Sequence, residues 1–249
     1  MSNLKLDASR QYYPTPIDLA TKMVNSISDW RYIETILEPS AGTGNIVEVL
    51  AKKEHILYGN RFDIDLIEIQ PELRAILKEK FSNDNNYLLS KEEKERKFAN
   101  EPSIVGDDFL SFSSYKHYDL IIMNPPFNDG ASHLLKALEM QKNGGTIVCL
   151  LNAETIKNPF SNEWKQWVRL LQKYNADVEY IENAFINSDN STAVEVALIK
   201  VFIPTKSKTD SEILKSLEKG EKVPDFDFKE CSLDVTDFIK SAINKFKYE

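Results

Sequence analysis

The stretch Tyr118-Asp-Leu-Ile-Ile-Met-Asn124-Pro125-Pro126-Phe127 combines an apolar run with an abrupt stop. Leu120 to Met123 are all apolar, which is typical of a strand buried on both faces of a parallel sheet. Two prolines follow, and each fixes its own φ, lacks an N–H and disfavours a helical residue before it. The sequence therefore predicts a stiff ledge at the carboxyl end of a strand, where open α/β sheets bind ligands.

The polar groups of this ledge suit one kind of substrate. The side-chain oxygen of Asn124 and the carbonyl of Pro125 can both accept hydrogen bonds, and Phe127 offers a flat face for stacking. Two acceptors beside a ring fit an NH₂ group on a planar base or amide. A Pro-Pro turn that merely closes a strand would contain the same residues, so the rest of the chain must decide.

Composition limits the class of protein. At 249 residues the chain can form one large domain, alone or with a small appendage, and its 42% hydrophobic and 28% charged content is that of a soluble globular protein. No run approaches the ~18 apolar residues of a membrane span, and the N-terminus lacks the apolar core of a signal peptide. We therefore expect a cytoplasmic protein without membrane contact.

The cysteines, histidines and net charge exclude further classes. Cys149 and Cys231 lie far apart and the three histidines are scattered, so we expect no structural metal. The net charge of −8 argues against a strong, freestanding nucleic-acid binder, because sequence-independent affinity comes from Lys and Arg on phosphates.

A glycine turn follows the first predicted strand, Ile33 to Leu37. It reads Glu38-Pro39-Ser40-Ala41-Gly42-Thr43-Gly44, and an amphipathic helix begins near Ile46. A strand, glycine turn and helix bring a ligand against backbone N–H groups. The third glycine of a dinucleotide site is missing, since Val47 takes its place, and a carboxylate at Glu38 suits a cationic amine better than a pyrophosphate. This pattern favours S-adenosylmethionine over NAD.

Acidic residues after the next two strands are candidates for holding a nucleoside. Among Asp63, Asp65 and Glu68, we choose Glu68 for ribose hydroxyls because a helix begins just after it at Pro71. A short strand from Ile104 then ends in Asp107-Asp108-Phe109. Asp108 can accept a hydrogen bond from the amine of an adenine while Phe109 packs nearby, and Asp107 is the less favoured choice.

The remaining chain completes a doubly wound, mostly parallel α/β sheet of seven strands. Thr15 is predicted to cap a helix from Ile17 to Ile27. Further helices are predicted at 133–140 and 162–174, and strands at 146–151, 178–181 and 193–203, the last two as a closing hairpin. We place a catalytic domain at 1–204 with a charged insertion at 82–102. A charged extension at 205–249 is expected to contain short helices near 210–219 and 234–246.

Taken together, these motifs resemble the S-adenosylmethionine-dependent N6-adenine DNA methyltransferases, over residues 10–203 and in the motif order of the gamma group. The resemblance implies that the cofactor S-adenosylmethionine contacts Tyr13, Thr15, Glu38, Ser40, Gly42, Gly44, Glu68, Asp108, Phe109 and Asn124. It implies a catalytic motif of Asn124, Pro125, Pro126 and Phe127, with a flipped adenine stacked on Phe127 and Phe185. The implied activity is site-specific DNA methylation of the kind used in restriction-modification.

Three alternatives to a complete DNA enzyme stay open. The Asn-Pro-Pro-aromatic motif also occurs in methyltransferases acting on ribosomal RNA bases or on a protein glutamine amide, although the Tyr-Pro-Thr-Pro loop at residues 13–16 favours DNA adenine. The chain can also be a methyltransferase-like subunit without catalysis. Because about 45 residues follow the last strand, DNA sequence recognition is expected from a partner specificity subunit, from a further recognition domain, or from the insertion and tail.

Overall fold

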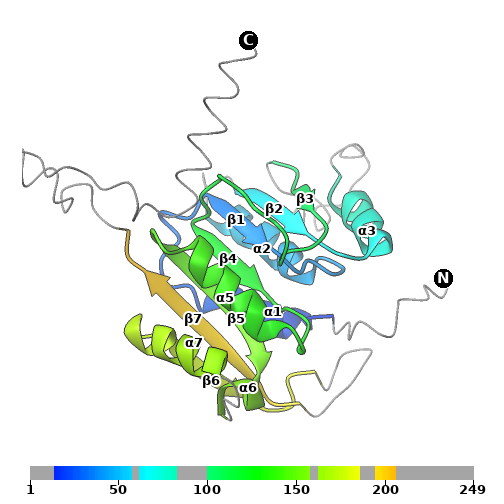
Figure 1. Ribbon diagram of the computed structural model, residues 1–249. Coiled ribbons are helices and arrows are strands. Elements are labelled where there is room, and N and C mark those ends of the chain that lie inside the picture. The colour runs from blue at the N-terminus through cyan, green and yellow to red at the C-terminus, as the bar shows by residue number, and fades with distance from the viewer. Residues whose placement is uncertain (1–13, 58–61, 83–99, 158–161, 186–193, 206–249) are drawn as a thin grey trace, which may run out of the picture. The chain divides into compact units, whose positions relative to one another are not determined.

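In the computed structural model, helices and strands alternate along the chain (Figure 1). The residues that it describes are 14–57, 62–82, 100–157, 162–185 and 194–205. The elements are α1 (Ile17–Asn25), β1 (Thr35–Glu38), α2 (Asn45–Ile56), β2 (Asp63–Ile67), α3 (Pro71–Phe81), β3 (Ser103–Gly106), β4 (Leu120–Met123), α5 (Gly130–Met140), β5 (Gly145–Asn152), α6 (Ala153–Lys157), α7 (Asn162–Lys173), β6 (Asp177–Ile181) and β7 (Val196–Ile203).

The described strands form one seven-stranded sheet in the order β3-β2-β1-β4-β5-β7-β6. The strands β1 to β5 pair in parallel, whereas β7 is antiparallel to both β5 and β6. The chain therefore has the predicted doubly wound fold with its closing hairpin. The strand order reverses between β1 and β4, and ligands of such sheets bind at this point, outside the carboxyl ends of the strands.

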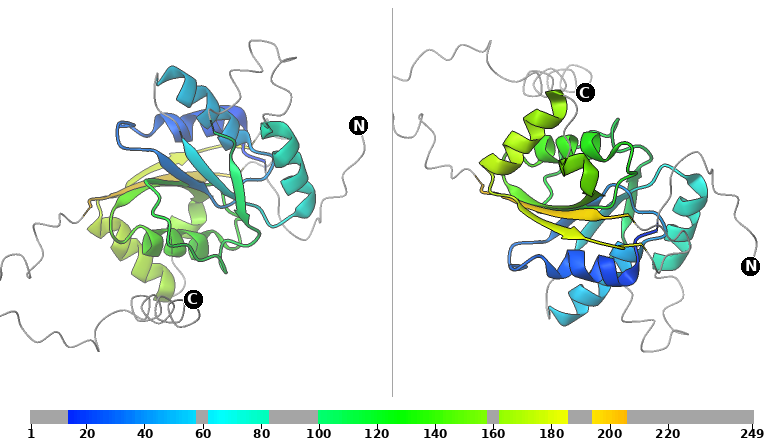
Figure 2. Two further views of the ribbon diagram at one scale, coloured as in Figure 1. Left: turned by 90° about the horizontal axis from the view of Figure 1, so that it is seen from above. Right: turned by 90° about the horizontal axis from the view of Figure 1, so that it is seen from below.

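Helices cover both faces of the sheet (Figure 2). The helices α1, α2 and α3 contribute to one buried apolar cluster, and α5 and α7 contribute to a second cluster on the other face. The central strand β4 belongs to both, because Leu120 and Ile122 point into the first cluster and Ile121 and Met123 into the second. This confirms the prediction of a strand buried on both faces.

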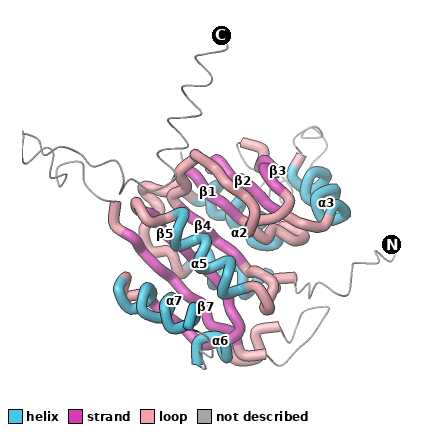
Figure 3. The backbone as a smooth tube through the Cα atoms, in the orientation of Figure 1, coloured by secondary structure: helices cyan, strands magenta, loops and turns pink. Residues whose placement is uncertain are grey.

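Several boundaries differ from the sequence prediction. The short helix α6 follows β5 directly and was not predicted (Figure 3). The helix α5 begins at Gly130, three residues before the predicted start at His133. A Cβ atom at Gly130 would lie 2.6 Å from Cδ2 of Leu151, so close packing against β5 explains a glycine in this first turn. The tail helices near 210–219 and 234–246, and most of the charged insertion, lie outside the described residues.

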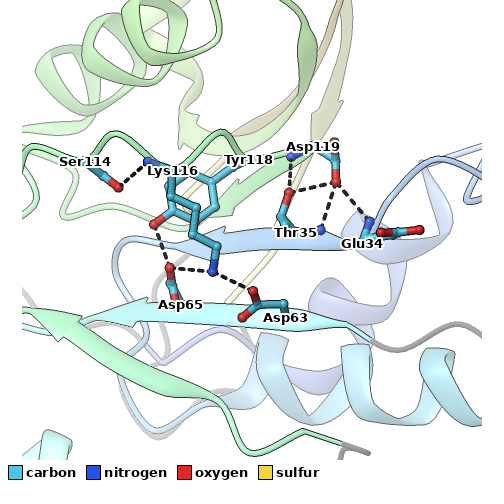
Figure 4. Close-up of polar contacts among 8 residues, drawn as sticks. All are labelled: Glu34, Thr35, Asp63, Asp65, Ser114, Lys116, Tyr118 and Asp119. Carbon is cyan, nitrogen blue, oxygen red and sulfur yellow. Dashed lines mark hydrogen bonds and ion pairs between the residues drawn. The ribbon is translucent and has the colours of Figure 1, made fainter.

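Asp119 ties the start of β4 to the start of β1 (Figure 4). Its Oδ2 atom accepts hydrogen bonds from the backbone N–H of Glu34 at 3.1 Å and from the N–H and hydroxyl of Thr35 at 2.9 and 2.7 Å. The Asp119 N–H in turn donates to the Thr35 hydroxyl at 3.0 Å. These bonds satisfy the backbone N–H groups of Glu34 and Thr35 at the start of β1. They also fix the position of β4 against β1.

A second polar group joins the segment before β4 to β2. Buried Asp65 accepts hydrogen bonds from the Tyr118 hydroxyl at 2.7 Å and the Lys116 ammonium at 2.9 Å, and Lys116 also pairs with exposed Asp63 (Figure 4). Burial and the hydrogen bond to Asp65 raise the pKa of Tyr118, so its hydroxyl stays a donor. We assign Asp63 and Asp65 to this structural contact.

No helix among the described residues combines the length and apolarity needed to cross a bilayer.

The buried Tyr118–Asp65 hydrogen bond is expected to contribute measurably to stability. Replacing Tyr118 with Phe keeps the ring but leaves the buried carboxylate with one donor fewer, so the free energy of unfolding should fall by about 1–2 kcal/mol. The control Asp63→Asn removes an exposed ion pair and should change it by less than about 0.5 kcal/mol. Urea unfolding measures both variants, and equal losses would contradict the assignment.

Candidate functional site

A cavity of about 270 Å³ opens where β1, β2, β3 and β4 end. This volume lies near the lower end of small-molecule sites, ~300–1,000 Å³. Within the described part of the chain, every predicted site residue lines it except Gly44 and Phe185. Tyr13 lies outside the described residues. The structure therefore brings the glycine turn, the Asp108 loop and the Asn124 ledge together in one place.

Glu68 holds the glycine turn against the end of β2. Its Oε2 atom accepts the N–H of Gly42 at 2.8 Å, and its Oε1 atom accepts the N–H of Gln70 at 2.9 Å. A carboxylate offers about four lone-pair sites, so about two remain for further donors, and Glu68 lines the cavity. Glu68 thus shapes the turn in addition to lining the site, which the sequence did not predict.

Gly44 is the residue immediately before α2 and does not line the cavity. Its φ is +79°, a left-handed conformation that favours glycine. A Cβ atom there would lie 2.5 Å from the Phe81 ring on α3. The ammonium of Lys80, also on α3, donates to the Thr43 carbonyl at 3.0 Å. The second half of the glycine turn is therefore fixed by packing and one hydrogen bond from α3.

Thr15 connects three parts of the site instead of capping α1. The helix begins after Pro16, and no side chain caps it, so the predicted capping role is wrong. The Thr15 hydroxyl accepts a hydrogen bond from Nδ2 of Asn124 at 2.9 Å, and its carbonyl accepts one from Nδ2 of Asn45 at 2.8 Å. The first of these bonds orients the Asn124 amide, with Nδ2 toward Thr15 and Oδ1 on the opposite side.

Glu38 is the most unusual charged group of the cavity. Its side chain ends β1 with only 1% of its surface exposed, and Oε2 has no hydrogen-bond partner among the described residues. Burial, followed by repulsion from Glu68, raises the pKa of Glu38 well above its usual range, while the charge of Lys80 acts in the opposite direction. A buried carboxyl group without a partner is costly unless a ligand completes it.

Asp108 and Phe109 form the far wall of the cavity. Asp108 is half-buried and accepts the N–H of Leu110 at 3.0 Å, whereas the less favoured Asp107 is exposed. Lys136 on α5 fixes this loop by donating to the carbonyls of Leu110, at 2.8 Å, and Phe112.

His133 is a cavity residue that sequence reasoning missed. Its ring lies 5.5 Å from the Phe109 ring, centroid to centroid, and its Nδ1 atom is 2.9 Å from the Asp129 carbonyl oxygen. Burial lowers the pKa of His133, which favours the neutral ring with Nδ1–H as donor. The available signal was its position in the first turn of the helix that follows the ledge, in the predicted helix at 133–140 as in α5.

The two aromatic residues predicted to stack on a substrate are placed differently. Phe127 lines the cavity and is partly exposed, whereas Phe185 is fully buried. Their rings meet edge to face, with centroids 5.8 Å apart and planes at 77°. In this structure Phe185 therefore supports the Phe127 ring from behind. No group of His, Cys, Asp or Glu in the described residues is arranged to hold a metal ion.

Neither a protein-family model nor a curated protein sequence matches the chain. Solved structures do resemble it. One is a protein of Listeria monocytogenes described as a candidate class I S-adenosylmethionine-dependent methyltransferase, with a TM-score of 0.53, 12% identity and coverage of 82% of this chain and 64% of that one. Another is a type I restriction-modification methyltransferase subunit of Streptococcus thermophilus, with a TM-score of 0.53, 12% identity and coverage of 85% and 54%.

A third similar structure is a dimethyladenosine transferase of Plasmodium falciparum, with a TM-score of 0.54, 15% identity and coverage of 83% of this chain and 69% of that one. The chain spans 64% and 54% of the length of the first two proteins. At these identities the likeness concerns the fold, which is the Rossmann-like fold of class I methyltransferases.

The conformation of Gly44 yields a stability test. In Gly44→Ala the alanine has to adopt a positive φ that is disfavoured for it, and its methyl group collides with the Phe81 ring. The free energy of unfolding should therefore fall by about 2–4 kcal/mol. Gly106→Ala is the matched control, because its φ is not left-handed and its Cβ would lie 3.2 Å from a Phe112 ring atom. We expect a loss of about 1 kcal/mol there. Denaturant unfolding measures both variants. Equal unfolding midpoints for Gly44→Ala and Gly106→Ala would contradict the role assigned to the Gly44 conformation.

Proposed function

We propose that the protein is a methyltransferase that moves a methyl group from S-adenosylmethionine to the exocyclic N6 amine of adenine in DNA. The observation that carries the proposal is the meeting of buried Glu38, Asp108 and the Asn124–Phe127 ledge in one cavity. These groups recognise an amine, an adenine and a planar NH₂ substrate. The similar fold of a type I restriction-modification methyltransferase subunit supports the methyltransferase part of the proposal.

The cavity groups fit the parts of S-adenosylmethionine. The Glu38 carboxyl, whose Oε2 atom has no hydrogen-bond partner among the described residues, suits the ammonium group of the methionine portion. The remaining lone pairs of Glu68 suit ribose hydroxyls, and half-buried Asp108 suits the amine of the cofactor's adenine. Ser40 and Gly42 belong to the glycine turn and also line the cavity. The cofactor, when bound, supplies an electrophilic methyl group.

The ledge supplies acceptors for the substrate amine. Because Thr15 binds Nδ2 of Asn124, the amide turns Oδ1 away from Thr15 as an acceptor, and the Pro125 carbonyl is the second acceptor. When the two N–H groups of the substrate amine donate to these two acceptors, the nitrogen lone pair is less conjugated with the ring and can attack the methyl group. The same acceptors stabilise the positive charge that develops on the nitrogen. No strong base is needed before transfer. Pro125 and Pro126 hold these acceptors rigidly, which favours a productive geometry.

A base must leave the duplex to reach this ledge. The partly exposed Phe127 ring offers a stacking surface that offsets part of the cost, and Phe185 supports that ring. We further propose that a partner specificity subunit or a further recognition region reads the DNA sequence. Two observations support this: the net charge is −8, and a similar fold occurs in a subunit of a type I restriction-modification system.

The function is tested by offering the protein S-adenosylmethionine labelled in its methyl group together with unmethylated DNA, total RNA or protein. Digestion of the labelled product identifies the modified residue. We expect N6-methyladenine in DNA. Label found in an RNA base or on a protein glutamine amide would show that DNA adenine is not the substrate and would identify the substrate class instead. No transfer to any acceptor, by a protein that binds S-adenosylhomocysteine, would indicate a subunit that is inactive alone.

Asn124→Ala should separate catalysis from cofactor binding. Loss of the amide oxygen removes one of two acceptors for the substrate amine, so the rate of transfer should fall at least ~10²-fold. Binding of S-adenosylhomocysteine should change little. Thr15→Val is the matched variant, because it removes the hydroxyl that orients the amide but keeps the amide itself, and we expect a smaller loss of rate. Single-turnover transfer at wild-type speed by Asn124→Ala would overturn the catalytic assignment.

A further inference from the structure

Two carboxyl groups from neighbouring parallel strands face one cavity. Glu38 is the last residue of β1, and Glu68 lies one residue beyond the end of β2. The register pairs Glu38 with Leu66, so both acids sit at the same edge of the sheet. Both line the cavity, and both are buried. Like charges this deeply buried cannot both be ionised cheaply without a nearby cation.

The hydrogen bonds distinguish the two acids. Both oxygens of Glu68 already accept backbone N–H donors, from Gly42 and Gln70. Glu38 has no such donors on Oε2 among the described residues. A proton on Glu38 therefore removes the repulsion at the least cost in hydrogen bonds.

Lys80, whose charge acts on Glu38, forms no hydrogen bond or ion pair with it among the described contacts. The Lys80 ammonium donates to the Thr43 carbonyl at 3.0 Å and pairs with Glu48 at 3.3 Å. Its charge reaches Glu38 only as a weaker long-range effect. The other titratable groups that line the cavity are Asp107, Asp108, Asp129 and His133. The three aspartates add negative charge, and His133, with its pKa lowered by burial, supplies little positive charge at neutral pH.

We propose that an ammonium group on the ligand replaces a proton on Glu38, and that this exchange makes the cavity select nucleosides with an aminoacyl tail over those without one. The inference rests on the proposed cofactor. The O–H bond of the Glu38 carboxyl breaks, its proton passes to water, and the carboxylate pairs with the ammonium; no other bond forms or breaks. Glu38 is therefore a specificity-determining residue that binds the end of the ligand opposite its adenine.

The exchange predicts a pH dependence with two limbs. As pH rises toward neutrality, protons compete less for Glu38, so affinity for an ammonium ligand should rise. Once the pH passes the pKa of the ligand's own α-ammonium group, the ligand loses its positive charge and affinity should fall again. A nucleoside thioether without the amine should lack both limbs.

Calorimetric titration at neutral pH tests the exchange, using two buffers with different ionisation enthalpies. The ligands are S-adenosylhomocysteine, which carries the α-amine, and 5′-methylthioadenosine, which lacks it. For the unaltered protein we expect net proton release with the first ligand and close to none with the second. This comparison needs no variant, so a folding defect cannot obscure it.

Two variants locate the proton. In Glu38→Gln, S-adenosylhomocysteine should bind without proton release and at least about tenfold more weakly, while binding of 5′-methylthioadenosine should change little. Glu48→Gln is the control, because Glu48 pairs with Lys80 and does not line the cavity. It should keep the proton release of the unaltered protein.

The failing outcomes are distinct. Binding of S-adenosylhomocysteine without proton release, or with release that persists in Glu38→Gln, would overturn the exchange and leave the proposed cofactor standing. Failure of both nucleosides to bind the folded protein would overturn the cofactor and the exchange together.

Discussion

Burial of β4 on both faces is the constraint on which the site depends. Its four apolar side chains divide between the two clusters, so the strand can occupy only the centre of the sheet, beside β1. Pro125 and Pro126 then end the strand at the crevice where the strand order reverses. The same crevice receives Glu38 from β1, so the acceptors of Asn124 and the buried carboxyl face one cavity because two central strands lie side by side.

Much of this arrangement followed from local sequence. The limits of β4 were predicted correctly, because an unbroken apolar run bounded by prolines has few other solutions. The glycine turn, the Asp108 loop and the ledge were placed correctly at strand ends, since the carboxyl ends of parallel strands share one edge of a sheet. Their meeting in one cavity is a consequence of topology, which the alternation of strands and helices had already restricted.

Features that arise from contacts between distant segments escaped prediction. The hydroxyl of Thr15 binds Asn124, 109 residues along the chain, whereas local sequence indicated only a helix cap. The early start of α5 places Gly130 so close to Leu151 that a Cβ atom there would lie 2.6 Å from it, and His133, in the first turn of the same helix, lines the cavity. The burial of Phe185 reflects packing that hydrophobicity alone does not distinguish from an exposed stacking position. In each case the missing information was a tertiary neighbour.

The central claim is that this cavity holds S-adenosylmethionine with its two ends recognised by acids that follow or end different strands, Glu38 at the end of β1 and Asp108 in the loop after β3. A crystal structure of the protein with S-adenosylhomocysteine tests it most directly. The account predicts the ligand ammonium against Glu38, the adenine amine against Asp108 and the thioether sulfur facing Asn124. A nucleoside bound elsewhere on the protein, or bound in the cavity with its amine away from Glu38, would contradict the account.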